Sequence, residues 1–179
     1  GTPFTFGLRQ LGANCGLIAQ HAAVEINGRA YWMSDNSFYV YDGVVKKMPC
    51  SVQDYVFDDL SYTNRNDIAC GINTAFNEII WYYPSANATA IDRGVAYNYL
   101  ENTWYTVNIG RTTWLGAYVF ENPIATEYDA SVTANVSTIL GLTAGASYLY
   151  AHESGNNQAD GTALPAFLTT GSVEIADGD

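Results

Sequence analysis

The chain has 179 residues, of which 14% are charged and 14% are aromatic, and its formal net charge is −11. Binding of nucleic acid through clustered cations is disfavoured, because only seven Lys and Arg stand against 18 Asp and Glu. The charge is still compatible with a protein surface that lines a channel for DNA, because such a surface should not bind a polyanion tightly.

Residues 1–20 predict an irregular leading segment. Gly7, Gly12 and Gly16 separate short apolar pieces there, and each Gly inside a helix would cost about 1 kcal/mol relative to Ala. From residue 21 onward the pattern becomes regular, so we place the first structural unit at 21–50.

Four short strands at 23–26, 29–33, 37–41 and 44–48 predict one antiparallel sheet in this first unit. The turns between them are Asn27-Gly28, Asp35-Asn36 and Asp42-Gly43. Asn-Gly is a strong signal for a two-residue hairpin, because both residues tolerate positive φ.

Residues 51–67 change period and predict a short helix followed by a polar connector. Val52, Tyr55, Val56 and Leu60 fall at helical spacing, and Ser51 with Asp54 resembles a capping box. We therefore expect at most one short helix, near residues 52–60.

The second unit, 68–122, holds three of the four Trp and predicts four strands at 68–72, 79–83, 95–100 and 103–109. A turn-rich loop joins its second and third strands. Nothing in this unit is arranged like an active site.

The third unit, 123–179, has a weaker strand pattern. Its predicted strands are 123–126, 144–152 and 166–175, with a flexible turn at 154–161 and an insertion strand at 131–142. Trp32 and Trp81, 49 residues apart, each close the second strand of a hairpin, and a period near 50 with about four strands is typical of propeller blades.

The predicted fold is therefore all-β, with about three antiparallel four-stranded blades of a β-propeller. Three blades cannot close a propeller, which takes 4 to 8 blades, so the others must come from a missing part of the chain or from another copy. We expect most strand aromatics and one aliphatic residue to be largely buried: Trp32, Phe38, Tyr39, Ile80, Trp81, Tyr97 and Trp104.

Cys15, Cys50 and Cys70 lack metal-type spacing, which favours buried free thiols in a reducing cytoplasm over a disulfide framework or a zinc site. No apolar run approaches the ~18 residues of a membrane span, and no signal peptide is visible. The chain begins with Gly1 instead of Met, so we expect it to be cut from a longer protein.

His152-Glu153 matches half of a zincin motif, but position 156 is Asn. We favour a turn residue at a strand end over a metal ligand. His21 precedes an apolar run and is expected to pack or to form a hydrogen bond. No Ser or Cys stands in a nucleophile-elbow context, and residues 141–145 lack the Lys of a phosphate loop.

A glycosidase would need two carboxylates about 5 to 9.5 Å apart. Candidates exist because the chain is acidic: Asp58, Asp59, Asp92 and Glu101. Two turns could offer oxygen ligands to calcium, but neither matches the EF-hand order and we favour turn formation as the explanation of both. Their residues are Asp35, Asn36, Asp42 and Gly43 in the first, and Asn156, Asn157, Asp160 and Gly161 in the second.

Asn87 and Asn135 open formal glycosylation sequons, which matter only in a secreted eukaryotic protein. Arg111 is expected to stack on the Trp114 indole as a local structural clasp. Tyr83 is expected to be exposed, where it could stack on a sugar.

A series of motifs, in this order and spacing, is similar to the tail nozzle proteins of short-tailed bacteriophages, also called tail tubular or packaged-DNA stabilisation proteins. The likeness covers roughly residues 20–125. The motifs are Tyr31-Trp32-Met33, Phe38-Tyr39-Val40-Tyr41-Asp42-Gly43, Pro49-Cys50, Asp54-Tyr55-Val56-Phe57-Asp58-Asp59, Phe76-Asn77-Glu78, Trp81-Tyr82-Tyr83-Pro84-Ser85, Tyr97-Asn98-Tyr99, Thr103-Trp104-Tyr105 and Arg111-Thr112-x-Trp114, with Tyr150-Ala151-His152-Glu153 and Asp177-Gly178-Asp179 as further echoes.

The resemblance implies a structural, non-enzymatic subunit of a ring, a hexamer in that family, that conducts DNA in the tail. It implies no catalytic, cofactor-binding or metal-binding residues. Its expected partners are further copies of the chain, other tail or portal-adaptor proteins, and genomic DNA in transient contact. The expected location is the virion tail after synthesis in the host bacterial cytoplasm, without membrane insertion. The alternatives are a carbohydrate-binding or glycoside-hydrolysing propeller and a secreted adhesion repeat.

Overall fold

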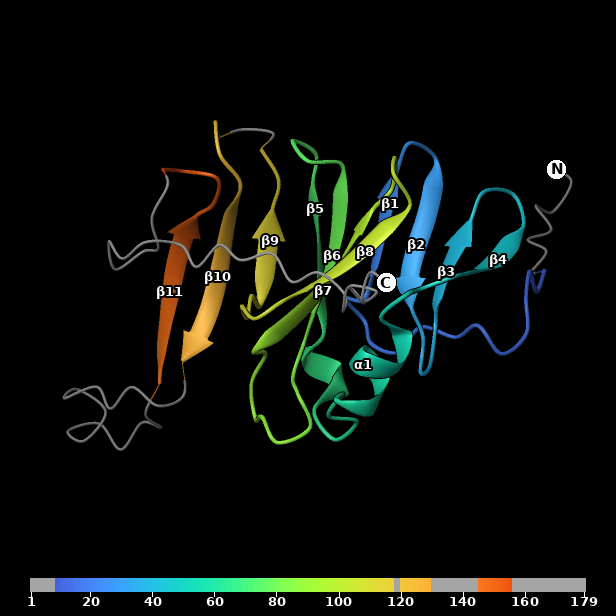
Figure 1. The fold of residues 1–179 in the computed structure, drawn as a ribbon, viewed down its shortest axis with the longest axis horizontal. Coiled ribbons are helices and arrows are strands. Elements are labelled where there is room, and N and C mark those ends of the chain that lie inside the picture. The colour runs from blue at the N-terminus through green and yellow to red at the C-terminus, as the bar shows by residue number, and fades with distance from the viewer. Residues whose placement is uncertain (1–8, 118–119, 130–144, 156–179) are drawn as a thin grey trace, which may run out of the picture.

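The computed structural model describes residues 9–117, 120–129 and 145–155. These residues form three antiparallel sheets and one short α-helix, so the all-β prediction is confirmed (Figure 1). No helix among them is long and apolar enough to cross a membrane. Residues 9–20, the described part of the predicted leading segment, contain no strand or helix.

Sheet 1 has the order β1-β2-β3-β4, with every pair antiparallel, as predicted. Asn27 and Gly28 connect β1 to β2 with φ values of 53° and 74°. Positive φ at both central residues defines the tight turn whose twist matches that of the flanking strands. The strand bounds are β1 Ala23–Ile26, β2 Arg29–Met33, β3 Phe38–Tyr41 and β4 Val45–Met48.

The connector between sheets 1 and 2 contains α1 (Gln53–Asp58) and a single 3₁₀ turn, η1 (Arg65–Asp67). The helix lies where predicted, and it buries Val56 with its neighbour Phe57. The predicted capping box is wrong, because Val52 occupies the N-cap position and provides no side-chain cap. Burial of its apolar side therefore holds this six-residue helix.

Sheet 2 has the order β5-β6-β7-β8, again an antiparallel meander. The long loop between β6 and β7 is closed by Asp92, whose carboxylate accepts hydrogen bonds of 2.7 Å from both the backbone N–H and the hydroxyl of Ser85. The strand bounds are β5 Ala69–Asn73, β6 Glu78–Tyr83, β7 Arg93–Asn98 and β8 Thr103–Val107.

Sheet 3 has three described strands in the order β11-β10-β9: β9 Thr113–Leu115, β10 Ile124–Asp129 and β11 Ala146–Ala151. The range 68–122 that we expected for the second unit includes β9, which the structure places in sheet 3. The sequence does not indicate this strand, because three residues are too few to show a period. The strands predicted at 131–142 and 166–175 lie outside the described residues.

Sheet 2 lies between the other two sheets and is buried on both faces. One face carries Ile79, Trp81 and Val95, which share a core with residues of sheet 1 such as Phe38. The opposite face carries Ile80, Tyr82 and Ala96 and packs against Trp114 of β9. Burial on both faces explains why β6 reads as a continuous apolar run without alternation.

Neighbouring sheets meet through their edge strands β1, β5 and β9. β5 contacts both β1 and β9, and residues 21 and 69 form a parallel bridge between the start of sheet 1 and the start of sheet 2. In Figure 1 the three sheets follow one another across the molecule in the order sheet 1, sheet 2, sheet 3. The three described sheets do not close into a ring.

The indole N–H of each of the four Trp donates a hydrogen bond to a backbone carbonyl outside its own sheet, at 2.8 or 2.9 Å. The pairs are Trp32 with Cys15, Trp81 with Ala22, Trp104 with Pro49 and Trp114 with Ile72. A buried indole needs such an acceptor, since an unpaired N–H would be costly.

Four of the seven residues predicted to be buried are buried: Phe38, Ile80, Trp81 and Tyr97. Trp32, Tyr39 and Trp104 are only partly buried. Trp32 and Tyr39 stack at 5.6 Å between ring centroids on the face of sheet 1 that points away from sheet 2. They are covered by the leading segment, whose carbonyls accept their N–H and O–H bonds.

Gly71 sets how closely sheet 3 can approach sheet 2, because a Cβ at this position would overlap the Trp114 indole. We predict that Gly71→Ala lowers the free energy of unfolding by about 1–3 kcal/mol, the usual cost of overpacking. Urea unfolding checks this value. Gly16→Ala is the control, since a Cβ there meets nothing within 4 Å, and a loss no larger than that of the control would contradict the prediction.

Candidate functional site

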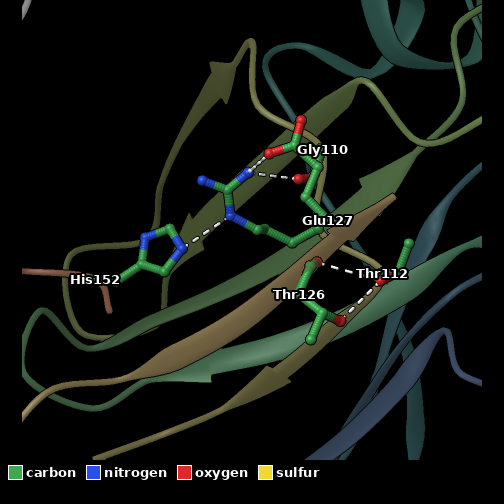
Figure 2. Close-up of polar contacts among 6 residues, drawn as sticks. Gly110, Thr112, Thr126, Glu127 and His152 are labelled. Carbon is green, nitrogen blue, oxygen red and sulfur yellow. Dashed lines mark hydrogen bonds and ion pairs between the residues drawn. The ribbon is translucent and has the colours of Figure 1, made fainter. Parts of the chain in front are cut away.

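A buried polar cluster lies where sheet 3 meets sheet 2, and it centres on Arg111, which is only 8% exposed (Figure 2). The preceding residue, Gly110, is pressed against the backbone of Ile91, so that a Cβ there would overlap the Ile91 carbonyl. This close crossing directs the Arg111 side chain toward sheet 3, immediately before β9 begins.

Three hydrogen bonds and one aromatic contact hold the Arg111 guanidinium. Nη1 donates to Glu127 Oε2 at 2.7 Å and to the Gly110 carbonyl at 2.6 Å, and Nε donates to His152 Nε2 at 2.9 Å. The guanidinium carbon lies 4.4 Å from the centroid of the Tyr150 ring. These contacts join the start of β9 to β10, β11 and the turn after β11.

The predicted stacking of Arg111 on Trp114 is wrong. The arginine stacks on Tyr150, and the Trp114 indole instead covers Gly71 and faces the His152 ring at 4.7 Å between centroids. The physical reason is the depth of the indole between the sheets, where its N–H reaches the Ile72 carbonyl.

Thr112 extends the contact between β9 and β10 beside the arginine. Its backbone N–H donates to the Thr126 carbonyl at 2.7 Å, and the two hydroxyls lie 2.8 Å apart. Figure 2 shows this pair next to the Arg111 contacts. The cluster is therefore backed by strand pairing and is held rigidly.

His152 is neutral in this setting. Burial and the nearby Arg111 charge lower the pKa of His152 to about 4, and its Nε2 accepts the hydrogen bond from Arg111. A histidine whose Nε2 is already occupied is poorly placed to take a proton from a substrate. The prediction that His152 and Glu153 form a turn after a strand is confirmed, since both directly follow β11.

The four carboxylates considered for glycoside hydrolysis serve other roles or lie apart. Asp59 forms an ion pair with Arg93 at 3.1 Å, and Asp92 closes the β6–β7 loop. Glu101 lies in the turn at the opposite end of β7 from Asp92. Asp58 is exposed at the end of α1.

The first candidate calcium turn holds its two carboxylates against cations. Asp35 accepts from Arg65 at 3.3 Å, and Asp42 accepts from Lys46 at 2.9 Å. The hydrogen bond from Lys46 lowers the pKa of Asp42. The second turn, 156–161, lies outside the described residues. Within the described part of the chain, no group of three or more His, Cys, Asp or Glu is placed to hold a metal ion.

Two side chains differ from their expected environments. Tyr83 was expected to be exposed but is completely buried, because β6 is covered on both faces. His21 was expected to pack but is exposed, and only its backbone pairs with Ala69. Asn87 is exposed in the β6–β7 loop, whereas Asn135 and residues 141–144 lie outside the described part. The three cysteines are free thiols.

Two adjoining hollows of about 480 and 500 Å³ follow the outer edge of β8. The connector residues Cys50 and Ser51 line both hollows; Asp54 and Tyr55 line the first, and Trp104 lines the second. Burial raises the pKa of the Cys50 thiol, which keeps it protonated. This groove offers contact surface, without a paired acid and base.

Sequence reasoning missed Glu127 and Tyr150 as partners of Arg111. The alternation of β10 places Glu127 on the same face as the buried Ala125, which is a signal for an inward carboxylate. Nothing in the sequence indicates that residues 150 and 152 return to residue 111, since 41 positions separate Arg111 from His152.

No protein-family model matches the chain, and no curated protein matches it. Function therefore has to be inferred from the fold, the charge and the motifs. In the Arg111 cluster the cation is bound to both the Glu127 carboxylate and the His152 imidazole. This arrangement can hold two sheets together.

The lowered pKa of His152 makes stability depend on pH. The unfolded chain takes up a proton near pH 6.5, while the folded chain does so only near 4. Stability from this residue is therefore present above pH 6.5 and is lost as the pH falls toward 4. After allowance for solvent screening, we predict a loss of about 1 kcal/mol, measured by urea unfolding at pH 7.5 and 4.5.

His152→Gln should remove this part of the pH dependence while keeping an acceptor for Arg111. The matched control is His21→Gln, because His21 is exposed, and it should retain the wild-type dependence. An unchanged pH dependence in His152→Gln would show that another group is responsible.

Proposed function

We propose that this chain is a structural subunit of the tail of a short-tailed bacteriophage and forms part of the nozzle through which DNA is retained and ejected. The observation that carries the proposal is the succession of antiparallel sheets that meet through the edge strands β1, β5 and β9. Such a succession supports a β-propeller, in which blades follow one another around a central channel.

The parallel bridge between residues 21 and 69 supports the same architecture, since equivalent strands of successive blades run in the same direction. In this proposal sheets 1, 2 and 3 are about three blades, and further blades complete the ring. The motif resemblance, which covers roughly residues 20–125, supports the assignment to the nozzle proteins of short-tailed phages.

Charge and surface composition support a conduit that does not hold DNA. A net charge of −11 repels phosphates, and four of the seven Lys and Arg are already ion-paired. The proposed partners are further copies of the chain in a ring, which the resemblance implies is a hexamer, together with tail or portal-adaptor proteins and passing DNA. The proposed location is the virion tail after synthesis in the host cytoplasm, and no enzymatic activity is proposed.

Carbohydrate binding is the second candidate, since the exposed Tyr55 lines the groove along β8 and an exposed aromatic ring can stack on a sugar. Hydrolysis is less favoured, because Asp59 and Asp92 are occupied by Arg93 and Ser85. The adhesion-repeat alternative loses support at its first calcium turn, where Asp35 and Asp42 are ion-paired.

Imaging of the particle tests the proposed function directly. We predict six copies around a pore at the distal end of a phage tail, and no measurable binding of duplex DNA by the purified protein at physiological salt. The physical reason for weak binding is the shortage of unpaired cations. Micromolar, salt-sensitive affinity for DNA, or an isolated monomer on the particle surface, would contradict the proposal.

A glycan array separates the two candidates. Under the nozzle proposal neither the wild type nor Tyr55→Ala binds sugars. Binding that Tyr55→Ala abolishes and Tyr62→Ala retains would favour the carbohydrate-binding alternative, because both residues are exposed and only Tyr55 lines the groove.

A further inference from the structure

A second polar cluster lies on the face of sheet 2 that meets sheet 3, at the end where β5 turns into β6. Asn73 and Glu78 are direct partners across the β5–β6 pair, so their side chains are neighbours on one face. Tyr105 of β8 is on the same face and forms a hydrogen bond with Glu78. Glu153, in the turn after β11, accepts a hydrogen bond of 3.0 Å from Asn73 Nδ2.

Two carboxylates from different sheets therefore meet without a cationic partner. The four ion pairs among the described residues involve Asp35, Asp42, Asp59 and Glu127 and include neither Glu78 nor Glu153. Burial raises the pKa of Glu78, and the negative charge of Glu153 raises it further. The two carboxylates therefore repel each other. The hydrogen bond from Tyr105 partly offsets this repulsion at Glu78, because it lowers the pKa of that carboxyl.

The Asn73 carboxamide supplies an independent observation. Asn73 is 2% exposed, and its Oδ1 has no hydrogen-bond partner, although its Nδ2 is bound to Glu153. A buried carbonyl oxygen without a donor is unfavourable, and such an atom in a native protein points to an ion or a water molecule. This oxygen belongs to the same carboxamide whose Nδ2 binds Glu153, and Asn73 is the cross-strand partner of Glu78.

The backbone also holds Glu153 in place for this contact. Glu153 has φ 56°, in the left-handed region that residues other than glycine seldom adopt. Such a conformation is strained and persists only where surrounding contacts require it. It accompanies the contact in which the Glu153 carboxylate accepts a hydrogen bond from Asn73 Nδ2 of sheet 2.

We propose that Glu78, Glu153 and Asn73 Oδ1 bind a divalent cation of the calcium class between sheets 2 and 3. Calcium accepts carboxylate and amide oxygens in irregular geometry and completes its shell with water, whereas magnesium demands a stricter octahedron. The ion offsets the repulsion between the two carboxylates and gives the amide oxygen a partner. It ties the turn after β11 to sheet 2, next to the Arg111 cluster. With two carboxylates the site is weak, with a Kd of about 10⁻³ M.

Thermal unfolding of the full chain in chelator and in calcium tests the proposal. About 5 mM calcium should raise Tm by about 2–4 °C relative to chelator, and magnesium should raise it less. Terbium should show luminescence sensitised by the adjacent Tyr105, and calcium should reduce that luminescence by competition.

Glu78→Gln separates a cation site from a merely structural carboxylate. In chelator the variant should unfold at a higher temperature than the wild type, because the repulsion with Glu153 is gone. In calcium it should gain nothing, and Glu153→Gln should behave in the same way. Glu101→Gln is the control, since Glu101 is exposed in a turn at the edge of sheet 2, and it should keep the full response to calcium.

Two outcomes would overturn the proposal. The first is a Tm independent of calcium, together with terbium luminescence no greater than that of Glu78→Gln, which would leave water as the partner of Asn73 Oδ1. The second is a calcium response that Glu78→Gln and Glu153→Gln retain in full, which would place the ion elsewhere. Neither outcome bears on the proposed conduit, which rests on the succession of sheets.

Discussion

Hydrogen bonds from the tryptophan indoles to backbone carbonyls of neighbouring elements are the interaction on which this arrangement of sheets depends. A tryptophan ring buries apolar area, but its N–H also needs a hydrogen-bond acceptor. A given backbone carbonyl can accept this bond only when the two elements lie in one relative position. Trp81 fixes sheet 2 against Ala22 before sheet 1, and Trp114 fixes β9 against Ile72 of sheet 2. The same ring that drives two sheets together therefore also sets their register.

The two interfaces of sheet 2 differ in character. Its face toward sheet 1 is apolar and aromatic, and the rings of Phe38, Trp81 and Trp104 contact one another there. Its face toward sheet 3 has one deeply inserted ring, Trp114 over Gly71, flanked by charged groups. Apolar burial dominates the first interface and is insensitive to pH, whereas charge contributes to the second.

The regular parts of the fold could be predicted from the sequence because their signals are local. Asn27-Gly28 specifies a hairpin by itself, and the period change at residue 51 marks α1. The errors at Tyr83 and Arg111 concern information carried by distant residues, whereas the capping box is a local signal that the structure does not use. Tyr83 was expected to be exposed, since a continuous apolar run does not say whether one or both faces are covered. The predicted stacking partner of Arg111 was also wrong. The sequence does not show how sheet 3 folds back, and this is what places Tyr150 instead of Trp114 against Arg111.

The turn after β11 links the two polar clusters of the second interface. His152 contacts Arg111, and the next residue, Glu153, contacts Asn73 of sheet 2. Two consecutive residues of one short turn thus serve both clusters, and the second of them, Glu153, adopts a positive φ. A change of charge in either cluster therefore acts on the same few backbone atoms. Sheet 3 is joined to sheet 2 by Trp114 on its edge strand β9 and by the turn that follows its other edge strand, β11, and the second attachment is the one that charge controls.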